Sequence, residues 1–290
     1  MGYPKPGGKN QGQMKANFAS CLRIVDPVTF ETVYLEEFEN KETVFSLFVS
    51  STVGLPGQVY LFLGIGEEAT LQRKCSMAYI NTYIFSQDGT RIQLLHKTPC
   101  ELIPSAFNEM RGRLISGVGN ILRVYEMGQK KLLRKFDNRN FKSNIVQIRC
   151  EENRIYVADT SESIHVLKFK PEHGQLYIFA DDVLNRWVTN FCMLDEDTVA
   201  GLDKFENFFV NRLPIGCEDV AEDDPTSTKF NFENGYLNGA AFKLDKVNQF
   251  FIGEVGTSIQ KCKLSLSSSE LIIFGTTMGS ICALMPLETR

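Results

Sequence analysis

The chain has 290 residues, of which 43% are hydrophobic and 22 are Phe, and it carries a formal net charge of −4 at pH 7. A chain of this length can bury a large core, whereas its acidic balance does not favour non-specific nucleic-acid binding, which needs Lys and Arg to neutralise phosphates. No stretch approaches the roughly 20 apolar residues of a membrane-spanning helix, and Met1 to Asn17 lacks the apolar run of a signal peptide, so we expect a soluble intracellular protein.

The eight cysteines are scattered along the chain and include no C-x-x-C pair. Zinc sites and secreted disulfide frameworks both depend on clustered or regular spacing, whereas most of these cysteines lie inside apolar runs. We therefore expect free, buried thiols in a reducing compartment.

Residues 1–17 are rich in Gly, Pro, Lys and Asn, which predicts a disordered tail or linker, and residues 18–290 are expected to form one architectural unit. Runs of about 4 to 8 β-branched and aromatic residues, bounded by turn signals, indicate β-strands throughout this region. The leading strands are predicted at 18–25 and 32–38. Three units of four strands follow, at 44–49, 59–65, 79–85 and 91–97; at 105–108, 113–117, 121–126 and 131–136; and at 145–149, 154–158, 163–169 and 175–180.

The densest strand pattern lies at 174–214, where four consecutive runs at 175–180, 187–194, 198–202 and 207–213 indicate one antiparallel sheet, although in chain order the first of them also completes the preceding unit. Residues 242–253 are then expected to supply the outer strand of the fourth unit. Three more strands, at 257–264, 271–275 and 280–284, form a last unit whose fourth strand is missing.

A four-stranded unit of roughly 40 to 45 residues is the period of a β-propeller blade, and helical periodicity is absent. The sequence therefore predicts an all-β fold, a β-propeller with about five to six four-stranded antiparallel blades present of the usual seven. The strand count indicates a segment of a longer chain. A two-sheet sandwich is the structural alternative.

No motif predicts catalysis, a cofactor or a metal site. The strings Gly64-Ile65-Gly66 and Gly117-Val118-Gly119 are followed by strands, whereas a phosphate-binding loop must open a helix. The three histidines lie in different units with no metal-ligand or nucleophile spacing.

Two charged runs have a structural and a functional interpretation each. The basic run 128–135, GQKKLLRK, is typical of a solvated blade edge, with phosphate-backbone contact as the alternative. The acidic run in 216–228 lacks the spacing and Gly of a calcium loop, so it indicates a disordered insertion, with a docking site for a basic partner as the alternative.

The single Trp, Trp187, begins a predicted strand directly after Arg186. A Trp at this place is most often part of a core, but Trp and Arg are also the residues most enriched at binding hot spots. In a propeller, the loop entering a first strand and the turn between second and third strands open on one face. The partner-binding residues predicted for this face are Asn120, Ser161, Glu162, Asp182, Arg186, Trp187, Asp203, Lys204 and Phe205.

Several strings resemble one known family. They are IFADD, RWVT and LDEDTVAGLDKFENFFVNRLP within 178–214, with LLHKTP, GVGNILRVYEMGQKKLLRK and LNGA elsewhere. They are similar to the large β-propeller proteins that include the A subunit of the cleavage and polyadenylation specificity factor and the damaged-DNA-binding protein 1 adaptor. The strings at 117–135 and 198–214 point to the splicing members of this family, and the resemblance covers about 18–286.

This resemblance implies a segment of the third propeller of a non-enzymatic, nuclear scaffold in splicing factor 3b of the U2 small nuclear ribonucleoprotein. The implied partners are the HEAT-repeat subunit and the small helical subunit of splicing factor 3b, with nucleic acid reached only through the complex. A ubiquitin-ligase adaptor or a polyadenylation-factor scaffold is the alternative within the family, and a propeller enzyme is the alternative from another class.

Overall fold

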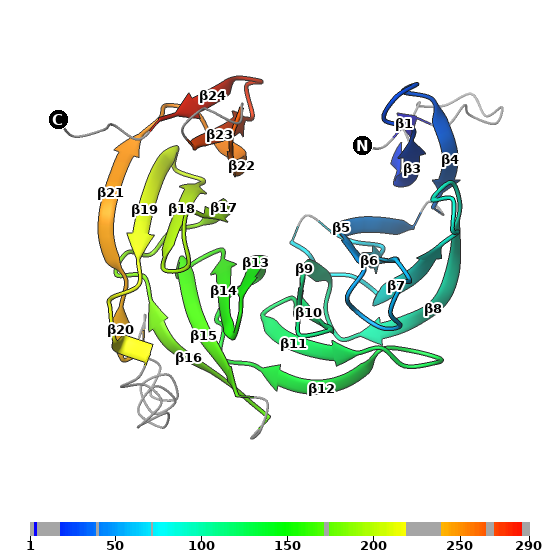
Figure 1. Ribbon diagram of the computed structural model, residues 1–290, viewed down its shortest axis with the longest axis horizontal. Helices are drawn as coiled ribbons and strands as arrows, with labels where there is room; N and C mark the ends of the chain where they lie inside the picture. The colour runs from blue at the N-terminus through cyan, green and yellow to red at the C-terminus, as the bar shows by residue number, and fades with distance from the viewer. Residues whose placement is uncertain are drawn as a thin grey trace. The chain divides into compact units, whose positions relative to one another are not determined.

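The computed structural model describes residues 3–4, 18–38, 41–70, 72–170, 174–218, 239–264 and 270–285. Its named elements are the β-strands β1 to β24 (Figure 1). No helix in the described part of the chain could span a membrane. The chain divides into two compact units, residues 1–119 with 124–135 and residues 120–123 with 136–290.

The first unit begins with two short pairings, β1 (Tyr3–Pro4) with β2 (Phe18–Ala19) and β3 (Cys21–Val25) with β4 (Thr32–Glu37). The rest of the predicted tail lies outside the described residues. A four-stranded antiparallel sheet follows in chain order, made of β5 (Glu42–Ser50), β6 (Tyr60–Glu67), β7 (Met77–Phe85) and β8 (Ile92–Cys100).

Strand β6 shows why this sheet holds its place, because it is buried on both faces. Successive side chains of a strand point to opposite faces. Leu61 and Leu63 accordingly pack with Leu22 of β3, whereas Phe62 packs with Phe107 on the other side. A sheet covered on both faces by neighbouring strands is the packing expected of a propeller blade.

The remaining sheets repeat this plan. One consists of β9 (Pro104–Met110), β10 (Arg113–Val118), β11 (Ile121–Glu126) and β12 (Leu133–Asn138). The second unit contains the sheet of β13 (Ile145–Glu151), β14 (Arg154–Asp159), β15 (Ile164–Lys170) and β16 (Gln175–Asp181), and the sheet of β17 (Val188–Met193), β18 (Thr198–Asp203), β19 (Asn207–Arg212) and β21 (Asp245–Phe251). It ends with β22 (Gly256–Cys262), β23 (Leu271–Thr276) and β24 (Ile281–Leu284).

The predicted strands are confirmed in order, and two pairings need correction. The runs at 174–214 do not make one sheet, because β16 pairs with β15 and leaves β21 to complete the sheet of β17, β18 and β19. The predicted outer strand at 242–253 is divided. Its start, β20 (Phe242–Lys243), pairs with β16 in parallel, held by a hydrogen bond of 2.8 Å from Leu244 N to Asp181 O, and only then does the chain cross to β19.

The first strand of every sheet that has three or more strands contains a register shift at the same place. One residue in each lacks a partner on the second strand, namely Phe45, Ser105, Val146, Thr189 and Thr257. In two sheets this residue has a hydroxyl that donates to the second strand at 3.3 Å, from Ser105 to Gly117 O and from Thr257 to Gly275 O. The Thr189 hydroxyl lies 3.2 Å from Leu202 O and makes a shorter bond, of 2.6 Å, to Gly256 O of the next sheet. A β-bulge that recurs at one position bends each strand alike, so the sheets are copies of one structural unit.

A glutamine connects the two large sheets of the second unit. Gln147 on β13 donates from Nε2 to Phe191 O at 2.9 Å and accepts from Phe191 N at 2.8 Å with its Oε1. The Phe191 ring is fully buried in a cluster that also holds Phe179 and Phe209. The hydrogen bonds between the Gln147 side chain and the Phe191 backbone, together with a shared aromatic core, therefore fix β17 against the preceding sheet.

We expect acid to destabilise the first unit through His96 on β8. This side chain is buried, and neither ring nitrogen has a hydrogen-bond partner within the described residues. Burial lowers the pKa of His96 in the folded state, so below its usual value of about 6.5 the unfolded chain binds more protons and stability falls as the pH falls. Melting temperatures between pH 7.5 and pH 5 should decline less for His96→Leu than for the wild type. Equal declines would contradict this assignment.

Candidate partner-binding surface

Trp187 lies at the end of the loop 182–187, which joins β16 to β17, and it meets the turn between β18 and β19. Lys204 N donates to Trp187 O at 2.9 Å, and Lys204 Nζ lies 3.8 Å from the centre of the Trp187 ring. The same backbone bond recurs in three other sheets, from Glu68 N to Lys41 O, from Gly119 N to Ile103 O and from Thr277 N to Val255 O. The repeated blade geometry therefore places Trp187 beside this turn.

The surface at this point is apolar and exposed. Trp187 is 41% exposed and Phe205 is 65% exposed, so Trp187 is not the core residue that its place in the sequence most often indicates. The loop that carries Trp187 also exposes Val183 and Leu184, two residues that the sequence interpretation did not select. We call Trp187, Lys204 and Phe205 the Trp187 patch.

Arg186 is buried beneath this patch, contrary to the expectation that it contacts a partner beside Trp187. Its Nε donates to Asp182 Oδ2 at 3.1 Å, and its Nη1 lies 3.9 Å from Asp203 Oδ2. Its Nη2 donates to Gln249 Oε1 of β21 at 3.1 Å, and the guanidinium lies 4.5 Å from the centre of the Phe209 ring. One cation thus connects the loop, the turn and the outer strand.

The two carboxylates around Arg186 also hold the backbone on which the patch is built. Asp182 Oδ1 accepts from Leu184 N at 3.1 Å, and Asp203 Oδ1 accepts from Phe205 N at 2.8 Å. Because both acids are buried, they shape the loop and the turn rather than touch a partner. The network therefore fixes the backbone of the Trp187 patch before any partner binds.

The other predicted residues lie in the equivalent turns, between the second and third strands, of their own sheets. Asn120, in the turn between β10 and β11, donates to Phe141 O at 3.0 Å. Ser161 is exposed in the turn between β14 and β15, whereas Glu162 is buried and lies 3.3 Å from Lys142 Nζ. Ser163 from the same turn donates to Asp182 Oδ2 at 2.6 Å, which ties this turn to the Arg186 network.

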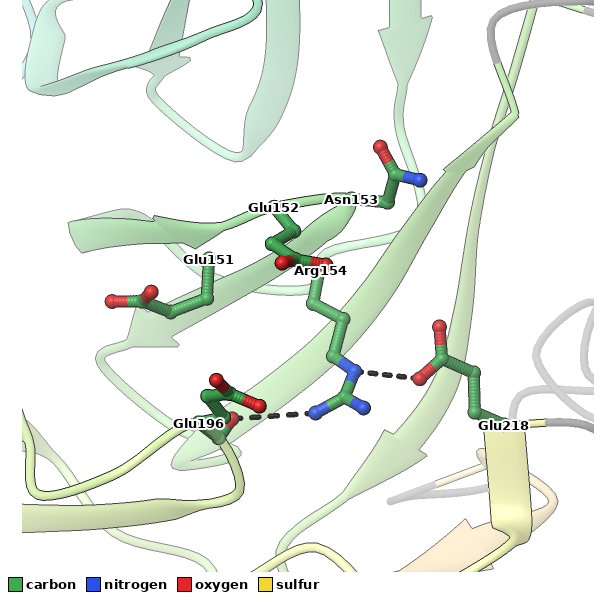
Figure 2. A pocket seen from close by; sticks show the side chains of 6 residues that line it. All are labelled: Glu151, Glu152, Asn153, Arg154, Glu196 and Glu218. Atoms are coloured by element: carbon green, nitrogen blue, oxygen red, sulfur yellow. Dashed lines mark hydrogen bonds and ion pairs between the residues drawn. The ribbon is translucent and has the colours of Figure 1, made fainter.

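A small pocket of about 120 Å³ lies at the opposite end of β13 and β14 (Figure 2). Its lining residues are Glu151, Glu152, Asn153, Arg154, Glu196 and Glu218. Arg154 spans it, donating from Nε to Glu218 Oε2 at 2.6 Å and from Nη1 to Glu196 O at 3.3 Å, as the dashed lines show.

Glu218 is the one member of the predicted acidic run that lies within the described residues. Burial alone would raise its pKa, but hydrogen bonds from Lys168 and Arg154 lower it, so the carboxylate stays charged. Arg154 and Glu218 therefore form an ion pair in the wall of the pocket. The pocket contains no nucleophile paired with a base.

The repeated four-stranded antiparallel sheets define the class, which is that of the β-propellers. A family model described as the CPSF A subunit region matches residues 19–290. The chain therefore belongs to this family, as its sequence resemblance indicated.

Relatives within the family are splicing proteins. The chain is 42% identical over 277 residues to "Probable splicing factor 3B subunit 3" of Dictyostelium discoideum, covering 95% of this chain and 22% of that protein. It is 40% identical to "Spliceosome-associated protein 130 A" of Arabidopsis thaliana, covering 100% of this chain and 23% of that protein. It is 36% identical to "Splicing factor 3B subunit 3" of Danio rerio, with the same coverage. The chain spans less than a quarter of each of these relatives.

Proposed function

We propose that this protein is a non-enzymatic scaffold in pre-mRNA splicing, a nuclear subunit of splicing factor 3b in the U2 small nuclear ribonucleoprotein, and that residues 18–290 form part of its third propeller. The names of the relatives support the assignment to pre-mRNA splicing. The β-propeller fold supports the scaffold role, since its loops present partner-binding groups on a rigid frame.

The observation that carries the docking role is the Trp187 patch. Exposed aromatic side chains on a rigid, pre-ordered backbone give contact area at low entropic cost, which is the character of an interface hot spot. Lys204 stacks on Trp187 and has no ion-pair partner within the described residues, so its ammonium can meet a carboxylate of the partner. We propose that the patch contacts the HEAT-repeat subunit or the small helical subunit of splicing factor 3b.

The process is tested by affinity purification of the full-length protein from nuclear extract, followed by mass spectrometry. Recovery of the splicing factor 3b subunits supports the proposal. Recovery of a cullin with its substrate receptors, or of polyadenylation factors, in their place would show that the protein serves another branch of the family.

A further inference from the structure

Two turns of the second unit share one sequence spacing but differ at its last position. Asp159, Glu162 and His165 have the spacing of Asp203, Glu206 and Phe209. The strand registers match, because His165 pairs with Val157 and Phe209 pairs with Gly201, each partner lying two residues before the Asp.

In both turns, Oδ1 of the Asp accepts a hydrogen bond from the backbone N–H two residues later. Asp159 Oδ1 accepts from Ser161 N at 2.9 Å, and Asp203 Oδ1 accepts from Phe205 N at 2.8 Å. The β14–β15 turn has an imidazole where its β18–β19 counterpart has a phenyl ring, and its Glu162 is buried, whereas Glu206 is half-buried.

The imidazole brings three metal-ligating groups together inside the protein. Asp159, Glu162 and His165 are each buried, and one ligand atom from each lies within 4.8 Å of the others. His165 Nε2 lies 3.4 Å from Asp159 Oδ2 and 3.9 Å from Glu162 Oε2. A hydrogen bond to a carboxylate is usually about 2.7 to 2.9 Å long. The 3.4 Å separation is a long hydrogen bond, and it is also close to the edge, about 3.3 to 3.4 Å, of a tetrahedron of ligands around Zn²⁺ with bonds of about 2.0 to 2.1 Å. The 3.9 Å separation of His165 Nε2 from Glu162 Oε2 must shorten when an ion binds.

The balance of charge around the two turns also differs. In the β18–β19 turn, the buried guanidinium of Arg186 hydrogen-bonds to Asp182 and lies near Asp203. In the β14–β15 turn, two buried carboxylates have Lys142 as the cation, with its Nζ 3.3 Å from Glu162 Oε1. That oxygen makes no hydrogen bond within the described residues, although it is buried. The Lys142 side chain is 32% exposed, so it can turn outward and leave the carboxylates to a divalent cation.

We propose that Asp159, Glu162 and His165 form a binding site for a divalent transition-metal ion of the zinc class. The ligand atoms are Asp159 Oδ2, Glu162 Oε2 and His165 Nε2, and water takes the remaining position. The second carboxylate oxygen of Asp159 is held by backbone N–H groups, and the Phe141 ring packs edge-on against His165 at 5.2 Å between ring centres, so both ligands are oriented in advance. The ion would stabilise the turn that connects to Asp182 through Ser163.

The test is a zinc titration of the chelator-treated 290-residue chain by calorimetry, together with its melting temperature. His165→Phe is the matched variant, because Phe is the residue that the β18–β19 turn accepts at this position. The wild type should bind one more equivalent of Zn²⁺ than His165→Phe and should melt at a higher temperature with Zn²⁺ than without it. The cysteines are the same in both chains, so zinc bound by thiols does not contribute to the difference in stoichiometry between them.

Glu162→Gln provides a second variant that keeps the shape of the side chain. We expect this change to weaken the affinity for the additional Zn²⁺ ion at least tenfold. Equal zinc stoichiometry in the wild type and His165→Phe, or unchanged affinity in Glu162→Gln, would overturn the proposal. If His165→Phe does not fold, the Zn²⁺ affinity of Glu162→Gln, compared with that of the wild type, tests the proposal by itself. Neither result depends on the splicing role, since no partner takes part in the measurement.

Discussion

Replacement of Arg186 by Met is expected to lower the free energy of unfolding by about 3 to 5 kcal/mol, which is the usual cost of removing one member of a buried ion pair. The change leaves Asp182 and Asp203 as buried carboxylates without their cation and leaves Gln249 Oε1 without its donor. The methionine can still cover the Phe209 ring, so the loss is chiefly electrostatic. Urea denaturation of the 290-residue chain measures it.

Lys204→Met is the matched control, because it removes a cation from the exposed side of the same turn. That cation stacks on an exposed Trp, a contact that contributes about 0.5 to 1 kcal/mol. If the Arg186 and Lys204 variants unfold at the same urea concentration, Arg186 does not hold the loop and the turn together.

Trp187→Ala is expected to weaken partner binding by more than about 2 kcal/mol, which is roughly thirtyfold in affinity, while changing stability much less. A fully buried Trp would behave differently, since its truncation costs about 3 to 5 kcal/mol of folding free energy. Trp187 is 41% exposed, so its truncation should cost much less folding free energy than that of a fully buried Trp. The measurements are the melting temperature of the variant and the recovery of the HEAT-repeat subunit with the full-length protein.

Phe205→Ala extends this prediction, because Phe205 is still more exposed and its side chain can be removed with little effect on the fold. We expect recovery of the HEAT-repeat subunit to fall further in the double variant than in either single one. A collapse of the melting temperature in Trp187→Ala, or full recovery of the subunit by the double variant, would show that Trp187 stabilises the fold and does not bind this partner.

The strands could be predicted closely because alternating or continuous apolar runs, such as Tyr60–Glu67 and Thr198–Asp203, end at clear turn signals. The strand pairing around residues 242–253 could not be predicted from the sequence. Residues 242–243 are too few to show a strand period, and their parallel bond to β16 depends on tertiary contacts with Asp181. The bulges also leave no sequence signal, since the unpaired residue is Phe, Ser, Val or Thr in different sheets.

The proximity of Trp187 to Lys204 follows from blade geometry, but the burial of Arg186 was missed. A signal for it does exist in the sequence. Successive side chains of extended backbone point to opposite sides, so if Val188 is buried, Trp187 faces outward and Arg186 faces inward. The structure shows this alternation, with Arg186 and Val188 buried and Trp187 exposed. A buried Arg next requires nearby carboxylates, and the sequence offers Asp182 four residues before it, whereas the approach of Asp203 depends on the blade geometry.

The most direct test of the docking role is photo-crosslinking in nuclear extract. A benzoylphenylalanine replaces Phe205 in the Trp187 patch in one sample and replaces the exposed Glu152, at the opposite end of β13 and β14, in another. We predict that the Phe205 position crosslinks to a subunit of splicing factor 3b and that the Glu152 position does not. Crosslinks to such a subunit from Glu152 alone would contradict the assignment of the Trp187 patch as the partner-binding surface.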